Sequence, residues 1–323
     1  MKPLISVIIP TYKRTKFLVK LLNNLIINNM NFKNFEIIIC DSDKTKTNFL
    51  IISKIINNFK NVKIKYINIL ENNHSKKRNT GIINASSNLL IFLDDDCLPE
   101  KKFISKYYKI LTREKDKAIF CGSVTYPNNQ SSFGRYRESR HFQISDKTLV
   151  SREIVKPEKI VTMNMAFNLS KINKKYLFNE NFNFYGFEDY DFAFNQAKSD
   201  IKIYRCSPTV AHYDLRTYEK YLHKIIFIGN EGMKHLIRLN YDASRKINYM
   251  LLEENFIIKN MLKIKYSFLL FKSLVNLTIY IEKKIVSFPM IIKMGIVFAY
   301  LTGCMLRKDV NKKYKFNNNN WYV

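Results

Sequence analysis

The sequence predicts an α/β fold of Rossmann-like type with a mostly parallel central sheet, and three observations support this prediction. Short β-branched runs alternate with amphipathic stretches from residue 4 to residue 93, which is typical of strand–helix units whose helices cover both faces of a sheet. Acidic residues directly follow two of the predicted strands, where ligands bind in such sheets. A chain of 323 residues with 46% hydrophobic content can also bury a large core.

The elements of this region are read from their apolar patterns. Buried runs predict strands at residues 4–9, 35–40, 62–69 and 89–93. Apolar residues at helical spacing predict helices between them at residues 16–27, 49–56 and 75–85. We expect Pro10 to end the first strand.

The chain is strongly basic, with a formal net charge of +27. Such a surface attracts polyanions, namely nucleic acid, anionic lipid or phosphorylated substrates. The lysines are spread along the chain, and no zinc-finger, RRM or helix-turn-helix signature is present. With eight glycines the chain also carries no GxGxxG fingerprint and no P-loop. Charge alone therefore does not identify the partner.

The cysteines and the first residues favour a cytoplasmic protein. The five cysteines are scattered, odd in number and never in a CxxC pair, which argues against disulfides and against a zinc site. The first residues lead directly into a predicted strand, without the length of a signal peptide.

Three consecutive acids, Asp94, Asp95 and Asp96, follow the fourth predicted strand. One interpretation is a solvated turn that opens the next helix. The other is a divalent cation that also holds a diphosphate, because adjacent carboxylates need a positive partner and Mg²⁺ binds carboxylates together with phosphate oxygens. Asp41 and Asp43 follow the second strand, so both acid groups are expected at the same edge of the sheet.

A second acid cluster lies in residues 185–191, before a predicted helix that runs to about residue 198. Its acids could cap the helix, or one could act as a general base, because aromatic neighbours raise a carboxylate pKa. Glu188 and Asp191 share a helix face, whereas Asp189 projects elsewhere and is available for catalysis. His212 alone suggests a structural role, but near acids that require a cation it becomes a candidate metal ligand.

The chain is predicted to divide into a catalytic domain, residues 1–242, and a helical C-terminal region, residues 243–323. Residues 266–281 and 285–306 are strongly apolar and could lie on a membrane surface, pack against the catalytic domain or span a bilayer. A central lysine disfavours spanning. We expect amphipathic helices on an anionic membrane, with these cations toward the headgroups: Lys272, Lys283, Lys284, Lys293, Arg307 and Lys308.

Over residues 4–240 the chain resembles the family 2 inverting glycosyltransferases of the GT-A fold, of the bacterial surface-polysaccharide type. Five motifs in family order carry the resemblance: residues 6–14 (SVIIPTYKR), 41–43 (DSD), 77–81 (KRNTG), 94–96 (DDD) and 188–189 (ED). Two motifs depart from the family pattern. The acids after the second strand are usually Asp-Asp-Gly-Ser, and Gly-Trp or Gly-Gly is commoner before the Glu-Asp pair.

The resemblance implies a metal-dependent, inverting transfer from a nucleotide-sugar, with UDP as the carrier, to a hydroxyl of a glycan or lipid-linked acceptor. Asp96, His212 and Asp94 would hold Mn²⁺ or Mg²⁺, and Asp189 with Glu188 would supply the base. Residues 164–167 would line the donor sugar. The donor nucleotide would be bound by Pro10, Thr11, Tyr12, Arg14, Asp41, Asp43, Lys77, Arg78, Asn79, Asp94 and Asp95.

Two other functions stay open at this point. A nucleotidyltransferase also binds a metal–nucleotide on a Rossmann-like sheet, although its usual glycine-rich phosphate loop is absent. A nucleic-acid-binding protein could use the basic surface, but the clustered acids would repel phosphate unless a metal intervened. We therefore expect a peripheral enzyme at the inner face of the cytoplasmic membrane, with no nucleic-acid partner.

Overall fold

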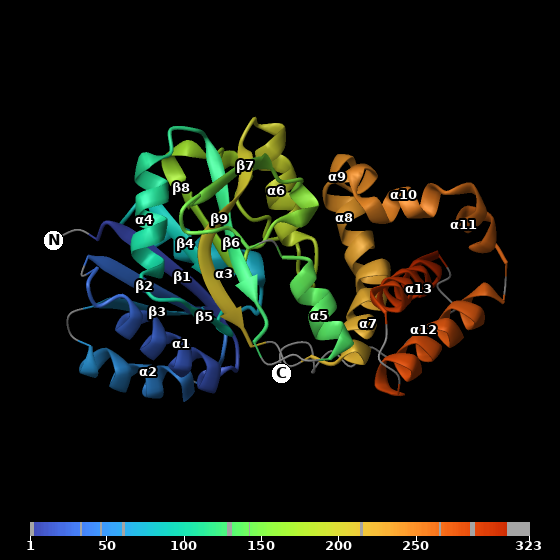
Figure 1. The fold of residues 1–323 in the computed structure, drawn as a ribbon, viewed down its shortest axis with the longest axis horizontal. Helices are drawn as coiled ribbons and strands as arrows, with labels where there is room; N and C mark the ends of the chain where they lie inside the picture. Colours follow the sequence, from blue (N-terminus) through green and yellow to red (C-terminus); the bar gives the residue numbers. More distant parts are fainter. Residues whose placement is uncertain are drawn as a thin grey trace.

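The computed structural model describes residues 3–32, 34–45, 47–59, 62–127, 131–141, 143–213, 216–264, 266–284 and 288–308. Figure 1 shows a sheet-containing half on the left, which carries the first part of the chain, and a helical half on the right, which carries the last part. Residues 285–287 and 309–323, which belong to the predicted C-terminal region, lie outside the described residues.

A nine-stranded sheet, in the order β3-β2-β1-β4-β8-β6-β9-β5 with β7 paired to β9, forms the first half. Six strands (β1, β2, β3, β4, β6 and β9) point one way, and β5, β7 and β8 run opposite to them. The bounds are β1 Ile5–Thr11, β2 Phe35–Asp41, β3 Lys63–Asn68, β4 Leu89–Leu93, β5 Cys97–Pro99, β6 Ala118–Thr125, β7 Val150–Ile154, β8 Asn164–Asn168 and β9 Lys202–His212. The α/β prediction with a mostly parallel sheet is confirmed.

The first four strands lie where the sequence predicts them, with one correction. Pro10 does not end β1, because it still pairs with Cys40 of β2. The pairing of β1 with β4 ends at Ile8, so Pro10 stands at an edge-like position where a missing N–H is tolerated. Every residue of β1 and of β2 is buried, as expected for strands covered on both faces.

The helices that follow these strands also match the prediction within a few residues. The first three are α1 Thr15–Asn28, α2 Thr47–Asn58 and α3 His74–Ile83. Helix α3 packs closely on β1, since a Cβ atom added at Gly81 would lie 2.3 Å from Cγ2 of Ile8. This approach requires a glycine and fixes α3 above the sheet.

The remaining helices connect the sheet to the second half. Helix α4 (Phe103–Arg113) packs on the sheet, while a second buried cluster surrounds α7 and α13 and draws aromatic side chains from α5 and α6. The bounds are α5 Ser132–Ser139, α6 Glu188–Lys198, α7 Tyr218–Phe227, the π-helix Ile228–Gly232, α8 Met233–Leu239, α9 Tyr241–Lys246, α10 Asn248–Glu254, α11 Phe256–Met261, α12 Ser267–Lys284 and α13 Pro289–Lys308.

Helix α13 is embedded in the second half. By length and composition, Pro289–Arg307 is the one described helix that could cross a membrane, and 61% of its most apolar stretch is buried in the protein. A Cβ atom at Gly303 would lie 2.1 Å from the carbonyl oxygen of Ile226 in α7. The guanidinium of Arg307 lies 2.5 Å from the carboxylate of Glu253 and is largely buried, so the prediction that Arg307 faces headgroups is wrong.

Candidate active site

A small cavity of about 150 Å³ lies at the carboxyl ends of β1 and β4. Twelve of the predicted site residues line it: Pro10, Thr11, Tyr12, Arg14, Lys77, Arg78, Asp94, Asp95, Asp96, Glu188, Asp189 and His212. They come from five parts of the chain, which the sheet, α3 and α6 bring together. A larger cleft of about 730 Å³ lies elsewhere and contains none of these residues.

Arg14 and Thr11 contact two of the three acids of the triad. The Arg14 guanidinium lies 3.1 Å from Oδ1 of Asp95 and 2.7 Å from Oδ2 of Asp96, and the Thr11 hydroxyl donates to Oδ2 of Asp95 at 2.6 Å. Burial and the neighbouring Asp96 nevertheless raise the pKa of Asp95 to about 7. Withdrawal from bulk water, the main cause, also raises the pKa of Asp94. The triad therefore retains an unmet demand for positive charge.

Strand pairing brings His212 to the triad. Cys97 of β5 lies directly opposite His212 of β9 in an antiparallel register, and Tyr213 N–H donates to the Asp96 carbonyl at 3.0 Å. As a result Nε2 of His212 lies 3.2 Å from Oδ1 of Asp96. The other ring nitrogen, Nδ1, is buried and has no hydrogen-bond partner among the residues that the structure describes.

The donor set fits a hard divalent cation. Ligand atoms of Asp96, Cys97 and His212 lie within 4.8 Å of one another. Burial and the adjacent carboxylates raise the pKa of the Cys97 thiol well above its ordinary value, and hard cations prefer oxygen to sulfur, so Cys97 is a poor ligand for them. The ligands that remain, carboxylate oxygen and imidazole nitrogen, suit Mn²⁺ or Mg²⁺.

Two cations of α3 reach the same cavity from the other side. The Lys77 ammonium donates to Oδ1 of Asn72 at 2.9 Å and to the Thr11 carbonyl at 3.3 Å, and burial lowers its pKa to about 8. The Arg78 guanidinium lies 3.8 Å from Asp94 and 3.4 Å from Glu188, so it bridges the two acid clusters. The Asn73 side chain caps α3 by accepting from Lys76 N–H, and this sets the direction of the helix.

The acids of α6 have different partners. Glu188 contacts Arg78 and accepts the Gly186 N–H at 3.3 Å, while Asp191 accepts from the Asn240 amide at 2.7 Å outside the cavity. Asp189 lines the cavity, and its Oδ1 accepts from Tyr190 N–H at 2.8 Å. Withdrawal from water and the nearby Glu188 raise the pKa of Asp189 to about 6. Of these acids, Asp189 has the properties of a general base.

Several predicted residues do not line the cavity. The Asp41 carboxylate is buried and accepts from Asn48 and Tyr66, each at 2.6 Å, and Asp43 accepts from Thr45 at 2.9 Å. The Asn79 amide donates to the Phe178 carbonyl at 2.7 Å and braces that segment.

The segment predicted to line the donor sugar, residues 164–167, is buried in β8. Asn164 bonds Tyr107 at 2.6 Å and the carbonyls of Ser123 and Pro208 at 2.9 Å. Thr162 and Met163, just before the strand, line the cavity, whereas residues 164–167 do not.

Four residues of the cavity wall were not predicted from the sequence: His74, Thr162, Met163 and Arg216. Tyr185, which also lines the cavity, is one of the aromatic neighbours expected around the second acid cluster, and Thr162 lies beside residues 164–167. Arg216 follows His212 closely in the sequence, which is the one signal that could have indicated it. His74 opens α3 and its ring lies edge-on to Tyr185, a contact between distant segments that spacing cannot reveal.

The fold and this site define a glycosyltransferase of the GT-A type. The chain belongs to glycosyl transferase family 2, whose sequence model matches residues 6–177.

Three known proteins illustrate the similarity. An uncharacterised glycosyltransferase of Rickettsia conorii is 33% identical over 139 residues, which are 42% of this chain and 21% of that protein. A mannosyltransferase of Pyrobaculum calidifontis, solved with GDP-Man and Mn²⁺, has a similar fold, with a TM-score of 0.60, 13% identity and coverage of 97% and 89% of the two chains. S. aureus TarS 1-349 with UDP-GlcNAc has a TM-score of 0.50, 15% identity and coverage of 97% and 94%.

Similarity to the curated relatives is partial. The chain covers 21% of the Rickettsia protein and half or less of the other curated relatives it matches. The two solved structures, both under 25% identical, establish the fold alone.

Proposed function

We propose that the chain transfers a sugar from a nucleotide-sugar to a hydroxyl of a glycan or lipid-linked acceptor, in one inverting, metal-dependent step. One observation carries the proposal: Asp189 and the Asp96–His212 pair line a single cavity together with Arg14, Lys77 and Arg78. A base, a candidate cation site and several cations in one place are what such a transfer requires.

The triad and the two cations of α3 would bind the donor. Asp96, His212 and Asp94 would hold the cation, which when bound supplies Lewis-acid stabilisation of a leaving diphosphate. Lys77 and Arg78 would bind the phosphates and add positive charge where negative charge develops. Thr11 and Arg14 hold Asp95, and so keep the triad in place.

The acceptor half falls to α6. Asp189 would accept the proton of the attacking hydroxyl as that oxygen bonds to the anomeric carbon and the diphosphate leaves from the opposite face. Its pKa of about 6 leaves it ionised at neutral pH and still basic enough to act. Glu188 would position the turn around Gly186 and hold Arg78.

The carrier nucleotide is proposed to be UDP. One structural neighbour is described with UDP-GlcNAc and another with GDP-Man and Mn²⁺, so both nucleotides belong in the test. Asp41 and Asp43 lie at the carboxyl end of β2, beside the cavity residue Thr11. Their carboxylates accept hydrogen bonds from the backbone N–H groups of Asp43 and Thr45. They would thereby shape the loop that contacts the base or ribose.

The proposed location is the inner face of the cytoplasmic membrane, and the proposed catalytic domain ends near residue 242. Exposed apolar side chains on α12, among them Leu269, Leu277 and Tyr280 at 59%, 51% and 60% exposure, support contact with lipid. Lys272 and Lys293 are exposed nearby, as anionic headgroups require.

The experiment that tests this function is binding and turnover of UDP-, GDP-, CMP- and dTDP-sugars, with Mn²⁺ and with EDTA. We expect metal-dependent binding of one sugar nucleotide and slow release of its nucleoside diphosphate. Release of pyrophosphate would indicate a nucleotidyltransferase instead. Failure to bind any donor, together with salt-dependent RNA binding, would favour the nucleic-acid function.

A further inference from the structure

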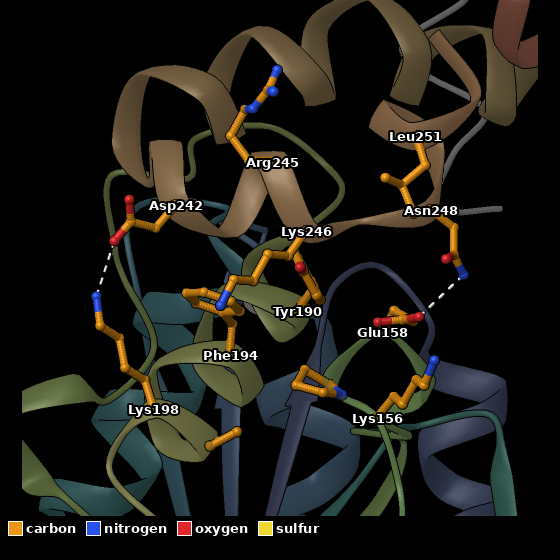
Figure 2. A pocket seen from close by; sticks show the side chains of 12 residues that line it. Lys156, Glu158, Tyr190, Phe194, Lys198, Asp242, Arg245, Lys246, Asn248 and Leu251 are labelled. Atoms are coloured by element: carbon orange, nitrogen blue, oxygen red, sulfur yellow. Dashed lines mark hydrogen bonds and ion pairs between the residues drawn. The ribbon is translucent and has the colours of Figure 1, made fainter. Parts of the chain in front are cut away.

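A second, larger cleft of about 730 Å³ lies outside the active-site cavity (Figure 2). Its lower wall in Figure 2 carries α6 and the 3-10 turn Pro157–Lys159, and its upper wall carries α9 and α10. The functions proposed above leave this cleft unused.

The floor of the cleft is aromatic and rigid. Tyr190 and Phe194, one turn apart on α6, line it although they are only 4% and 8% exposed. The Tyr190 hydroxyl donates to the Ala243 carbonyl at 2.9 Å, which fixes the ring. Leu251, at 56% exposure, adds an apolar edge on the opposite wall. Because the two rings are almost fully buried, the apolar surface that the cleft offers to a ligand is mainly that of Leu251, with polar groups around it.

The rim of the cleft is basic, and two of its cations are available. Lys198 pairs with Asp242 at 2.9 Å, whereas Glu158 accepts from the neutral Asn248 amide at 3.1 Å and keeps its negative charge (both contacts are dashed in Figure 2). Lys246 extends over the Phe194 ring, 5.8 Å from its centroid.

The ammonium groups of Lys156 and Lys246 are the available cations. Within the described part of the chain, neither has a carboxylate at ion-pair distance. Two unpaired amines against one unpaired carboxylate, Glu158, leave the cleft with a net positive charge, which favours a negatively charged ligand over a neutral one.

The cleft is continuous in sequence with the active site. The segment that supplies Glu158 continues to Thr162 and Met163 of the active-site wall, and Tyr190 follows Asp189 directly. At about 1.5 Å per residue, the far end of α6 is roughly 13 Å from Asp189 along the helix axis. Several linked sugars can span that distance.

We propose that this cleft binds an anionic stretch of the acceptor glycan, one that carries carboxylate or phosphodiester groups. Sugar rings would lie against Leu251 above the buried aromatic floor, while Lys156 and Lys246 would bind the acidic groups. Identification of the ligand as acceptor rests on the proposed function, whereas binding of an acidic glycan to the cleft does not.

The test measures binding to the full chain by calorimetry at low salt, without donor. The probes are tetragalacturonate, a phosphodiester-linked hexose oligomer, and neutral maltotetraose. We expect at least one acidic probe to bind at least about tenfold more tightly than maltotetraose, with affinity that falls as salt is raised.

Two variants locate that binding. Lys156→Glu with Lys246→Glu should weaken it about tenfold or more, and Leu251→Trp, which fills the cleft without changing charge, should do the same. The matched control is Lys54→Glu with Lys115→Glu, two exposed lysines outside the cleft that make the same change in net charge.

Retained binding in both cleft variants, equal loss in the control, or no binding of either acidic probe would overturn the proposal. The donor panel is scored separately. If the chain turns over no donor but still binds an acidic probe through the cleft, the proposed ligand of the cleft is supported and the proposed function is excluded.

Discussion

At the scale of single residues, the three acids of α6 carry the same chemical group but differ in their contacts. Glu188 is held by Arg78 and the Gly186 N–H, and Asp191 by Asn240, whereas Asp189 faces the cavity with a raised pKa. The sequence predicted Asp189 from its different helix face. The residues that contact each acid depend on the tertiary structure, which sequence spacing alone does not reveal.

Asp189→Asn is expected to lower the rate of sugar transfer by about 10²–10⁴-fold, because the amide cannot accept the proton of the acceptor hydroxyl. Donor affinity should change little, since the phosphate-binding side chains are on other elements. Stopped assays of transfer and calorimetry with the donor measure the two quantities. A variant that lost donor binding in parallel would contradict the assigned role.

The pH dependence of kcat/KM should follow the protonation of Asp189. The raised pKa of Asp189 means that it is protonated, and inactive as a base, below about pH 6. We expect kcat/KM to rise about tenfold per pH unit below this value and to level off above it. Because Glu188 contributes to the raised pKa, Glu188→Gln should move the rising limb to lower pH. A limb that does not move in this variant would indicate another group.

His212→Ala should weaken Mn²⁺ binding by at least about tenfold, since second-shell substitutions alone cost that much. Electron paramagnetic resonance of free Mn²⁺ measures this without donor or turnover. The control is His223→Ala on α7, an exposed histidine outside the cavity. Equal Mn²⁺ affinity in the native chain and His212→Ala would rule out ligation by His212.

At the scale of elements, periodicity predicted the first strands and helices because each is a local pattern. The later strands were not predicted in this way. Strand β5 has only three residues, and β9 is interrupted by a bulge, because Ser207 and Pro208 lie where β6 passes directly from Gly122 to Ser123. Such strands are defined by their partners, so only the folded sheet reveals them.

Gly81→Ala tests the contact between α3 and β1. The new methyl group would meet Ile8, which is fully buried and cannot move aside. Overpacking of this kind costs about 1–3 kcal/mol, more than the gain of up to about 1 kcal/mol in helix propensity. Urea unfolding should therefore show a lower free energy of unfolding.

An Ile8→Ala background provides the control for this substitution. Removal of the Ile8 γ-carbons eliminates the clash, so in that background Gly81→Ala should be neutral or stabilising. An equal loss of stability in both backgrounds would mean that the Ile8 contact is not the cause.

At the scale of the whole molecule, the helical half has both an inner and an outer apolar face. Phe271, Val275 and Ile279 of α12 are buried against the second core, while Leu269 and Tyr280 of the same helix are exposed. Helix α13 is held by the close contact at Gly303 and by the Arg307–Glu253 pair. These contacts favour a helix that stays with the protein over one that leaves it to cross a bilayer.

Vesicle binding tests the outer face. The chain should sediment with phosphatidylglycerol vesicles at low salt, bind less at high salt, and bind neutral phosphatidylcholine weakly. Leu269→Asp with Tyr280→Asp should reduce binding, and Ser53→Asp with Lys54→Asp on α2 is the control on a surface remote from α12 (Figure 1). Equal binding of vesicles by the native chain and the α12 variant would exclude this face as the membrane-binding surface.

The register that sets Cys97 opposite His212 has a consequence for synthesis of the chain. A nascent polypeptide that has emerged only to residue 177, the limit of the family match, already carries the triad but lacks both His212 and Asp189. Long-range pairings of this kind form late, because the intervening segment must first be ordered. Translation must therefore pass β9 before His212 can lie beside Asp96, and an incomplete product would carry the triad without two of the residues proposed to act with it.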